Sequence, residues 1–141
     1  MEVQEYTIKN SSFELKHIFE CGQCFRWNEQ VDGSYIGVFK SNVMSVKKKN
    51  DTITFRGICN GDIQKVCEDY FDLNRDYEKI KAKLKSVDDF LKTSIEYGYG
   101  IRILNQDLWE CIISFIISAN NNIPRIKKII ERISFKYGNK I

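Results

Sequence analysis

Short apolar runs that alternate with polar positions dominate the first 60 residues of the chain. Such alternation over about four to eight residues is typical of strands with one buried face. The breaks between the runs are rich in Gly, Asn, Asp and Ser, and Ser41-Asn42 is a predicted hairpin turn. Because these loops are too short for crossovers, neighbouring strands must be antiparallel. The predicted strands span residues 3–9, 24–28, 34–40, 43–49 and 52–56.

The pattern then changes to helical spacing, with Asp62 as the expected N-cap of the first long helix. The run from Leu108 to Ser118 is almost wholly apolar and predicts a buried helix. No later segment covers that helix, so we expect the chain to stop inside a second, helical domain. Strands followed by helices indicate an α+β fold. A helical turn is predicted at residues 13–19, and helices at 62–71, 77–85, 86–97, 108–118 and 123–137.

The charge is unevenly distributed, although the formal net charge is only +3. Residues 1–97 are close to neutral, whereas residues 98–141 hold seven basic and three acidic side chains. The predicted helix 123–137 is amphipathic, and we interpret Lys127 and Lys128 as a solvated or phosphate-facing surface. A positive field at this end of the chain is compatible with nucleic-acid binding.

Several function classes are disfavoured by composition. No apolar run reaches the roughly 18 residues of a membrane span, and no signal pattern opens the chain, so we expect a cytoplasmic protein that does not bind membranes. Five cysteines without a signal peptide suggest free thiols. Cys21 and Cys24 form a C-x-x-C pair, but the two further ligands of a zinc site are missing and His17 is the only histidine. We therefore expect neither a metal nor a cofactor.

Three consecutive amides at Asn120, Asn121 and Asn122 separate the apolar helix from the basic one. Each Asn side chain carries two donors and one acceptor, and leaving such groups buried without partners costs about 1–3 kcal/mol each. The triplet is therefore either a solvated turn or a set of polar groups presented to a polar partner. Asn122 can also cap the following helix, where Pro124 is tolerated in the first turn.

Three motifs occur together in a recognisable order. G-Q-C-F-R-W spans residues 22–27, G-I-R-I-L-N-Q-D spans residues 100–107, and N-N-N-I-P-R spans residues 120–125. In this order the chain resembles the 8-oxoguanine DNA glycosylases of the helix-hairpin-helix superfamily, over about the first half of such an enzyme. The resemblance implies a TATA-binding-protein-like α+β domain at residues 1–105 and the first helices of the catalytic domain at residues 106–141. The prevalence of Lys, Ile and Asn, together 47 of 141 residues, points to an AT-rich bacterial genome.

The resemblance also implies roles for individual residues. The Gly22 carbonyl would accept a hydrogen bond from N7–H of 8-oxoguanine, whereas normal guanine has a lone pair at N7. Asn120 would fill the gap left by the extruded base, and Arg125 would donate to the unpaired cytosine. Asn121 and Asn122 belong to the same implied DNA-binding set. The implied partner is duplex DNA that contains 8-oxoguanine opposite cytosine.

The resemblance places no catalytic residue in this chain. The family uses a Lys nucleophile and an Asp in its C-terminal half, so that remaining half is an expected partner and the chain alone is expected to be inactive. The complete enzyme would attack C1′ with an amine, form a Schiff base and nick the strand by β-elimination. Two alternatives stay open: a non-catalytic nucleic-acid-binding module, and an alkylpurine glycosylase of the same superfamily.

Overall fold

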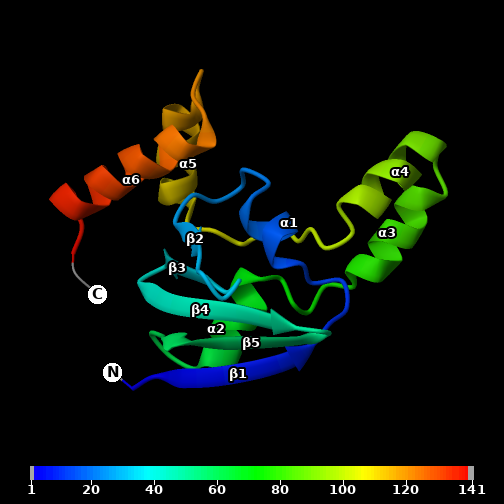
Figure 1. The fold of residues 1–141 in the computed structure, drawn as a ribbon, viewed down its shortest axis with the longest axis horizontal. Coiled ribbons are helices and arrows are strands. Elements are labelled where there is room, and N and C mark those ends of the chain that lie inside the picture. The colour runs from blue at the N-terminus through cyan, green and yellow to red at the C-terminus, as the bar shows by residue number, and fades with distance from the viewer. Residues whose placement is uncertain (1, 140–141) are drawn as a thin grey trace.

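A computed structural model describes residues 2–139 of the chain. Its centre is one five-stranded antiparallel sheet with strand order β1-β5-β4-β3-β2 (Figure 1). The strands from β2 to β5 form the predicted meander, and β1 pairs with β5 at the opposite edge. The strands are β1 (Gln4–Lys9), β2 (Trp27–Glu29), β3 (Tyr35–Phe39), β4 (Asn42–Lys49) and β5 (Thr52–Ile58).

Two strand predictions need correction. The hairpin turn between β3 and β4 lies at Lys40 and Ser41, one residue earlier than predicted, because both residues have left-handed φ angles of 44° and 61°. Asn42 already pairs with Phe39 in the ladder. The predicted strand 24–28 is wrong at its start, since residues 24–26 form a loop and β2 begins only at Trp27.

Helices follow the sheet in the predicted order. Asp62, Asp76, Asp88 and Asp107 each accept a hydrogen bond from a backbone N–H of the helix that they precede, as N-caps do. The predicted bounds of three helices, 77–85, 108–118 and 123–137, agree with the structure. The helices are α1 (Leu15–Phe19), α2 (Ile63–Tyr70), α3 (Tyr77–Lys85), α4 (Asp89–Tyr97), α5 (Leu108–Ser118) and α6 (Ile123–Tyr137).

An aromatic cluster fills the core between the sheet and the helices α1 and α2. Trp27 is 1% exposed and stacks on Phe19 with ring centroids 4.3 Å apart. The indole N–H of Trp27 donates to the Tyr70 hydroxyl at 3.0 Å, so the polar atom of this buried ring has a partner. Phe39 stacks on Tyr70, and Phe71 packs against Phe39. The start of β2 is therefore fixed by the densest part of the core.

Two helical hairpins extend from this core on opposite sides of the view (Figure 1). One is formed by α3 and α4, the other by α5 and α6. The prediction that α5 is buried is wrong for the described part of the chain, because Trp109 is 69% exposed and Phe115 is 79% exposed. The helix packs against α6, and its remaining apolar side faces solvent. No helix within residues 2–139 is both long and apolar enough to cross a membrane.

Candidate nucleic-acid interface

The loop between α1 and β2 exposes the backbone of Gly22. Gly22 has a left-handed φ of +84°, and a Cβ atom built there would meet nothing within 4 Å. Glycine is favoured at this position by its backbone conformation and not by a lack of space. No hydrogen bond within residues 2–139 uses the Gly22 carbonyl. A main-chain acceptor is therefore open to a ligand at this position.

Gln23 anchors the same loop through its side-chain amide. Its Nε2 donates to the carbonyl of Ile18 at 2.9 Å and to the carbonyl of Arg102 at 2.8 Å. Its Oε1 accepts from the Leu104 backbone N–H at 3.0 Å. The backbone carbonyl of Gln23 accepts from the side-chain amide of Gln106. These bonds join the first motif, residues 22–27, to the second motif, residues 100–107.

Arg102 holds the second motif against the core. It is 2% exposed, and its guanidinium donates to the backbone carbonyls of Phe71 at 3.0 Å and Asp72 at 2.6 Å. The guanidinium carbon lies 4.1 Å from the ring centroid of Tyr77, within the range of a cation–π contact. Burial lowers the pKa of Arg102, and the Asp72 carboxylate opposes this shift. These contacts of Arg102 are all with the protein itself, and they indicate a structural role for this residue of the second motif.

The three asparagines of the third motif have different surroundings. Asn122 is the N-cap of α6, and its Oδ1 accepts from the Arg125 N–H at 3.1 Å. Asn121 donates from Nδ2 to the Ile117 carbonyl at 3.0 Å and so completes the C-terminal turn of α5. Asn120 has a left-handed φ of +51° and is exposed at the tip of the turn. Within the described residues, the side-chain amide of Asn120 makes no hydrogen bond.

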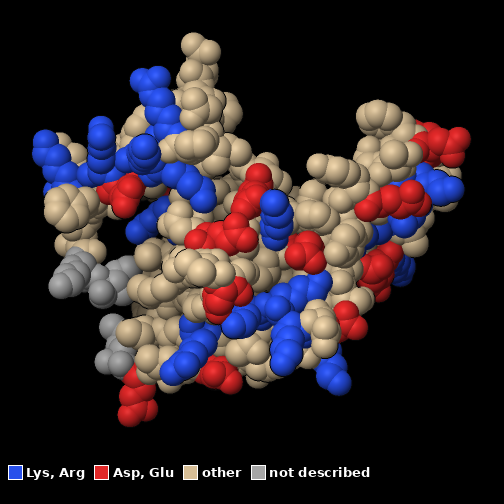
Figure 2. All heavy atoms as spheres, in the orientation of Figure 1, with Lys and Arg blue, Asp and Glu red and all other residues tan. Residues whose placement is uncertain are grey.

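A basic surface adjoins this tip. Figure 2 shows Lys and Arg side chains gathered over α6 on one face of the molecule. Arg125 and Lys128 are exposed, and neither forms a salt bridge within residues 2–139. Lys127 does not lie on the solvated or phosphate-facing surface on which it was predicted with Lys128. It is half-buried, and its ammonium donates to the Trp27 carbonyl.

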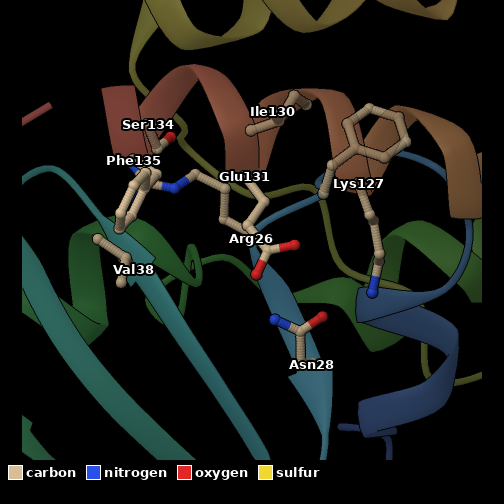
Figure 3. Close-up of a pocket in the computed structure, with 9 residues that line it drawn as sticks. Arg26, Asn28, Val38, Lys127, Ile130, Glu131, Ser134 and Phe135 are labelled. Atoms are coloured by element: carbon tan, nitrogen blue, oxygen red, sulfur yellow. The ribbon is translucent and has the colours of Figure 1, made fainter. Parts of the chain in front are cut away.

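The α5–α6 hairpin is attached to Trp27 at the start of β2 and to Arg26, which precedes this strand. Arg26 lies 3.6 Å from the Glu110 carboxylate on α5, and Figure 3 shows Lys127 reaching from α6 toward the start of β2. Burial raises the pKa of Glu110, and the opposite charge of Arg26 limits that rise. A cavity of about 480 Å³ lies between α6 and the sheet. The cavity contains none of the predicted site residues, and it is lined by Phe25, Arg26, Asn28, Val38, Lys127, Ile130, Glu131, Ser134 and Phe135.

The predicted site residues fall into two groups that do not touch. Gln23 contacts residues 102–106, which lead into the first turn of α5, whereas the asparagines follow its last turn. The two ends of α5 are about 16 Å apart, as expected for an α-helix of 11 residues. This spacing suits two contacts with different parts of one extended ligand.

The C-x-x-C pair has the geometry of incidental thiols. Cys21 is exposed, Cys24 is buried, and both are free. Burial raises the pKa of the Cys24 thiol to about 12, so this thiol is protonated and unreactive near neutral pH. Among residues 2–139, no group of three or more metal-binding side chains comes together.

Sequence reasoning missed the roles of Gln23 and Gln106. Gln23 lies in the first motif and Gln106 in the second, but no contact was predicted for either side chain. Their partners lie up to 83 residues away along the chain, so local patterns gave no signal for them. The only hint in the sequence was that each of the first two motifs, residues 22–27 and 100–107, contains a glutamine.

The comparison with known families identifies the class of protein. Residues 5–112 match the family described as "8-oxoguanine DNA glycosylase, N-terminal domain", and the chain therefore belongs to this family. The match confirms the resemblance carried by the three motifs, and it agrees with the predicted α+β fold.

Individual relatives make the assignment more specific. "N-glycosylase/DNA lyase OGG1" of Arabidopsis thaliana is 29% identical over 136 residues, which cover 90% of this chain and 36% of the relative. "N-glycosylase/DNA lyase" of Saccharomyces cerevisiae is 28% identical over 152 residues, which cover 95% of this chain and 39% of the relative. The chain thus spans a little over a third of the length of these curated relatives.

Solved structures extend the likeness to the whole described fold. The Clostridium acetobutylicum 8-oxoguanine glycosylase/lyase, in complex with duplex DNA containing cytosine opposite 8-oxoguanine, is 46% identical with a TM-score of 0.89. The structure of MBOgg1 with a low-affinity DNA ligand is 45% identical with a TM-score of 0.90. Each match covers 100% of this chain and about half of the other, 50% and 51% respectively.

Proposed function

We propose that this chain is the N-terminal portion of a bifunctional DNA glycosylase and abasic-site lyase that excises 8-oxoguanine from duplex DNA. The family match and the similarity to an enzyme solved with cytosine opposite 8-oxoguanine support this substrate. The catalytic Lys and Asp would come from the remaining C-terminal half. Within this chain, the N-terminal α+β domain would span residues 1–105, and residues 106–141 would begin the helical catalytic domain. We also infer action on DNA in the cytoplasm, at a bacterial nucleoid.

The observation that carries the proposal is the free carbonyl of Gly22. It is presented by a left-handed glycine in an exposed loop whose next residue is anchored on three sides. A carbonyl oxygen accepts hydrogen bonds only. It attracts the N7–H of 8-oxoguanine and repels the N7 lone pair of guanine, so one acceptor distinguishes the two bases.

The turn between α5 and α6 would act on the opposite strand. Asn120 is exposed and its amide is uncommitted within the described residues, which suits insertion into the vacated stack. Arg125 lies in the first turn of α6 and would donate to the unpaired cytosine. Asn121 and Asn122 use their side chains within the turn, so they would support Asn120 and not contact the bases directly.

Borohydride trapping with the complete protein tests the proposal. Reduction of a Schiff base should link the protein to duplexes that carry 8-oxoguanine opposite cytosine, and not to matched duplexes with guanine. Binding without trapping or excision would favour the non-catalytic module. Release of alkylated purines without trapping would favour the alkylpurine glycosylase.

A further inference from the structure

The side chain of Gln23 makes three hydrogen bonds, although this residue lies in a loop beside the exposed Gly22. Its amide donates to the Ile18 carbonyl, donates to the Arg102 carbonyl and accepts from the Leu104 N–H, at 2.9, 2.8 and 3.0 Å. We propose that Gln23 is a positioning residue for base recognition, which fixes the direction of the Gly22 carbonyl. This inference rests on the proposed function.

The partners of Gln23 select an amide over other side chains. Two of them are carbonyls that only accept, and the third is an N–H that only donates. A planar group with two donors and one acceptor satisfies all three. An ionised Glu at this position would have no donor and would turn an oxygen toward two carbonyl oxygens. A Met of similar length would make none of the three bonds.

The anchors of Gln23 lie on both sides of the loop that carries Gly22. Ile18 belongs to α1, which precedes the loop, and Leu104 belongs to the segment that leads into α5. Gln106 adds a bond to the Gln23 backbone carbonyl. Gly22 has no side chain that could hold it in place, and its carbonyl lies in the same planar peptide unit as the Gln23 N–H. The direction of its carbonyl is therefore set by the residue that follows.

Recognition by a single acceptor depends strongly on this direction. A displacement of about 1 Å at a reacting or recognising group can reduce a rate about 100-fold. The effect should be confined to steps that read the base. Cleavage at a preformed abasic site offers no base to Gly22, so that step should not depend on Gln23.

Two variants of the complete protein test the inference. Gln23→Glu should lower single-turnover excision of 8-oxoguanine about 100-fold, and Gln23→Met should lower it to a smaller extent. Cleavage of the same duplex with a preformed abasic site should stay within twofold of wild type for both. Hydrogen exchange provides a second measurement. The Leu104 amide should exchange faster in Gln23→Met, which lacks its acceptor, and not in Gln23→Glu, which keeps one.

Gln4 provides a matched control. Its amide also bridges backbone groups, since Nε2 donates to the Gly61 carbonyl at 2.9 Å and Oε1 accepts from the Ile63 N–H at 3.1 Å. Gln4→Glu should leave both activities unchanged.

Three outcomes would overturn the inference. If Gln23→Glu retains excision, or if both variants lose excision and abasic-site cleavage equally, Gln23 is not a positioning residue for the base. The second result would assign it a general structural role. A wild-type protein that is inactive on both duplexes would instead overturn the proposed function, and this inference with it.

Discussion

The α1–β2 loop and the α5–α6 turn both carry amide side chains, and they use them differently. In the loop, the amide of Gln23 is directed inward and the main chain of Gly22 is left open. In the turn, Asn121 and Asn122 are directed inward and the side chain of Asn120 is left open. A main-chain carbonyl only accepts hydrogen bonds, which suits detection of the N7–H proton of a base. A side-chain amide has donors and an acceptor, which suits insertion into the gap that an extruded base leaves in the stack.

The two places also differ in what fixes them. The loop leads into Trp27, which is buried in the aromatic core, and it is tied to a segment some 80 residues away. The turn is held by hydrogen bonds to residues no more than four positions away. Recognition of the damaged base would therefore depend on the whole fold, and insertion into the stack on local capping.

The largest expected effect comes from Gly22→Ala in the complete protein. An L-residue in the left-handed region costs about 1–2 kcal/mol, so relaxation of the loop should rotate the carbonyl and reduce 8-oxoguanine excision about 100-fold. Gly33→Ala is the matched control, because Gly33 has a φ of +76° against +84° and equally open space. Both variants should lose similar unfolding free energy in thermal denaturation. Equal excision by the two variants would remove Gly22 from the site.

A smaller effect, on stability, is expected where β3 packs against Trp27, the buried residue that follows the α1–β2 loop. In Gly37→Ala, the new Cβ would lie 2.3 Å from the Trp27 ring, which stacks on Phe19 and cannot move freely. Overpacking of this kind reduces the free energy of unfolding by about 1–3 kcal/mol, measurable by chemical denaturation. In a double-mutant cycle, Gly37→Ala should cost less unfolding free energy when Trp27 is replaced by Phe, because the smaller ring leaves room for the new Cβ. Independent, additive effects of the two changes would show that the ring is not the cause.

Substitutions in the α5–α6 turn should change the free energy of unfolding by no more than the contribution of one helix cap. Asn122→Ala should reduce the free energy of unfolding by about 1 kcal/mol, because Arg125 N–H loses its acceptor. Asn120→Gly should change stability by less than about 0.5 kcal/mol, since the Asn120 side chain is exposed and glycine adopts the left-handed φ of +51° without strain. Excision of 8-oxoguanine should show the reverse order and fall more in Asn120→Gly than in Asn122→Ala. The distinction between the two asparagines fails if both variants lose the same stability and the same activity.

The smallest effect is chemical and leaves the fold intact. At pH 8 only about 10⁻⁴ of Cys24 should be thiolate, because burial raises its pKa to about 12. The exposed Cys21 should be alkylated much faster in the native protein, as followed by peptide mass spectrometry. Unfolding in denaturant should remove the difference. Equal labelling of the native thiols would mean that the C-x-x-C loop opens in solution.

Local sequence patterns predicted the helices better than the site. The predicted bounds of α3, α5 and α6 agree with the structure, where Asp76, Asp107 and Asn122 are N-caps whose hydrogen bonds are made within three residues. The antiparallel meander followed from short loops in the same way. In both cases the deciding interactions are close in sequence.

The errors share the opposite cause. Residues 24–26 alternate like a strand, but the bonds of Gln23 to residues 102–106 hold this segment as a loop. The apolar composition of α5 predicted burial without specifying what would cover it, and Phe115 is exposed. Lys127 was placed on a solvated face, yet it reaches a carbonyl of β2, 100 residues away. Contacts between distant segments leave little trace in local periodicity.

The contact of Lys127 with β2 has a consequence for self-association. β2 is an edge strand of three residues, and free backbone groups on such an edge can recruit a strand from another molecule. The Lys127 ammonium takes one of these carbonyls, and α6 passes close to the start of this strand. A charged side chain and a covering helix are two of the ways in which proteins prevent edge-to-edge aggregation. The hairpin that carries the asparagines therefore also protects the start of the β2 edge from intermolecular pairing.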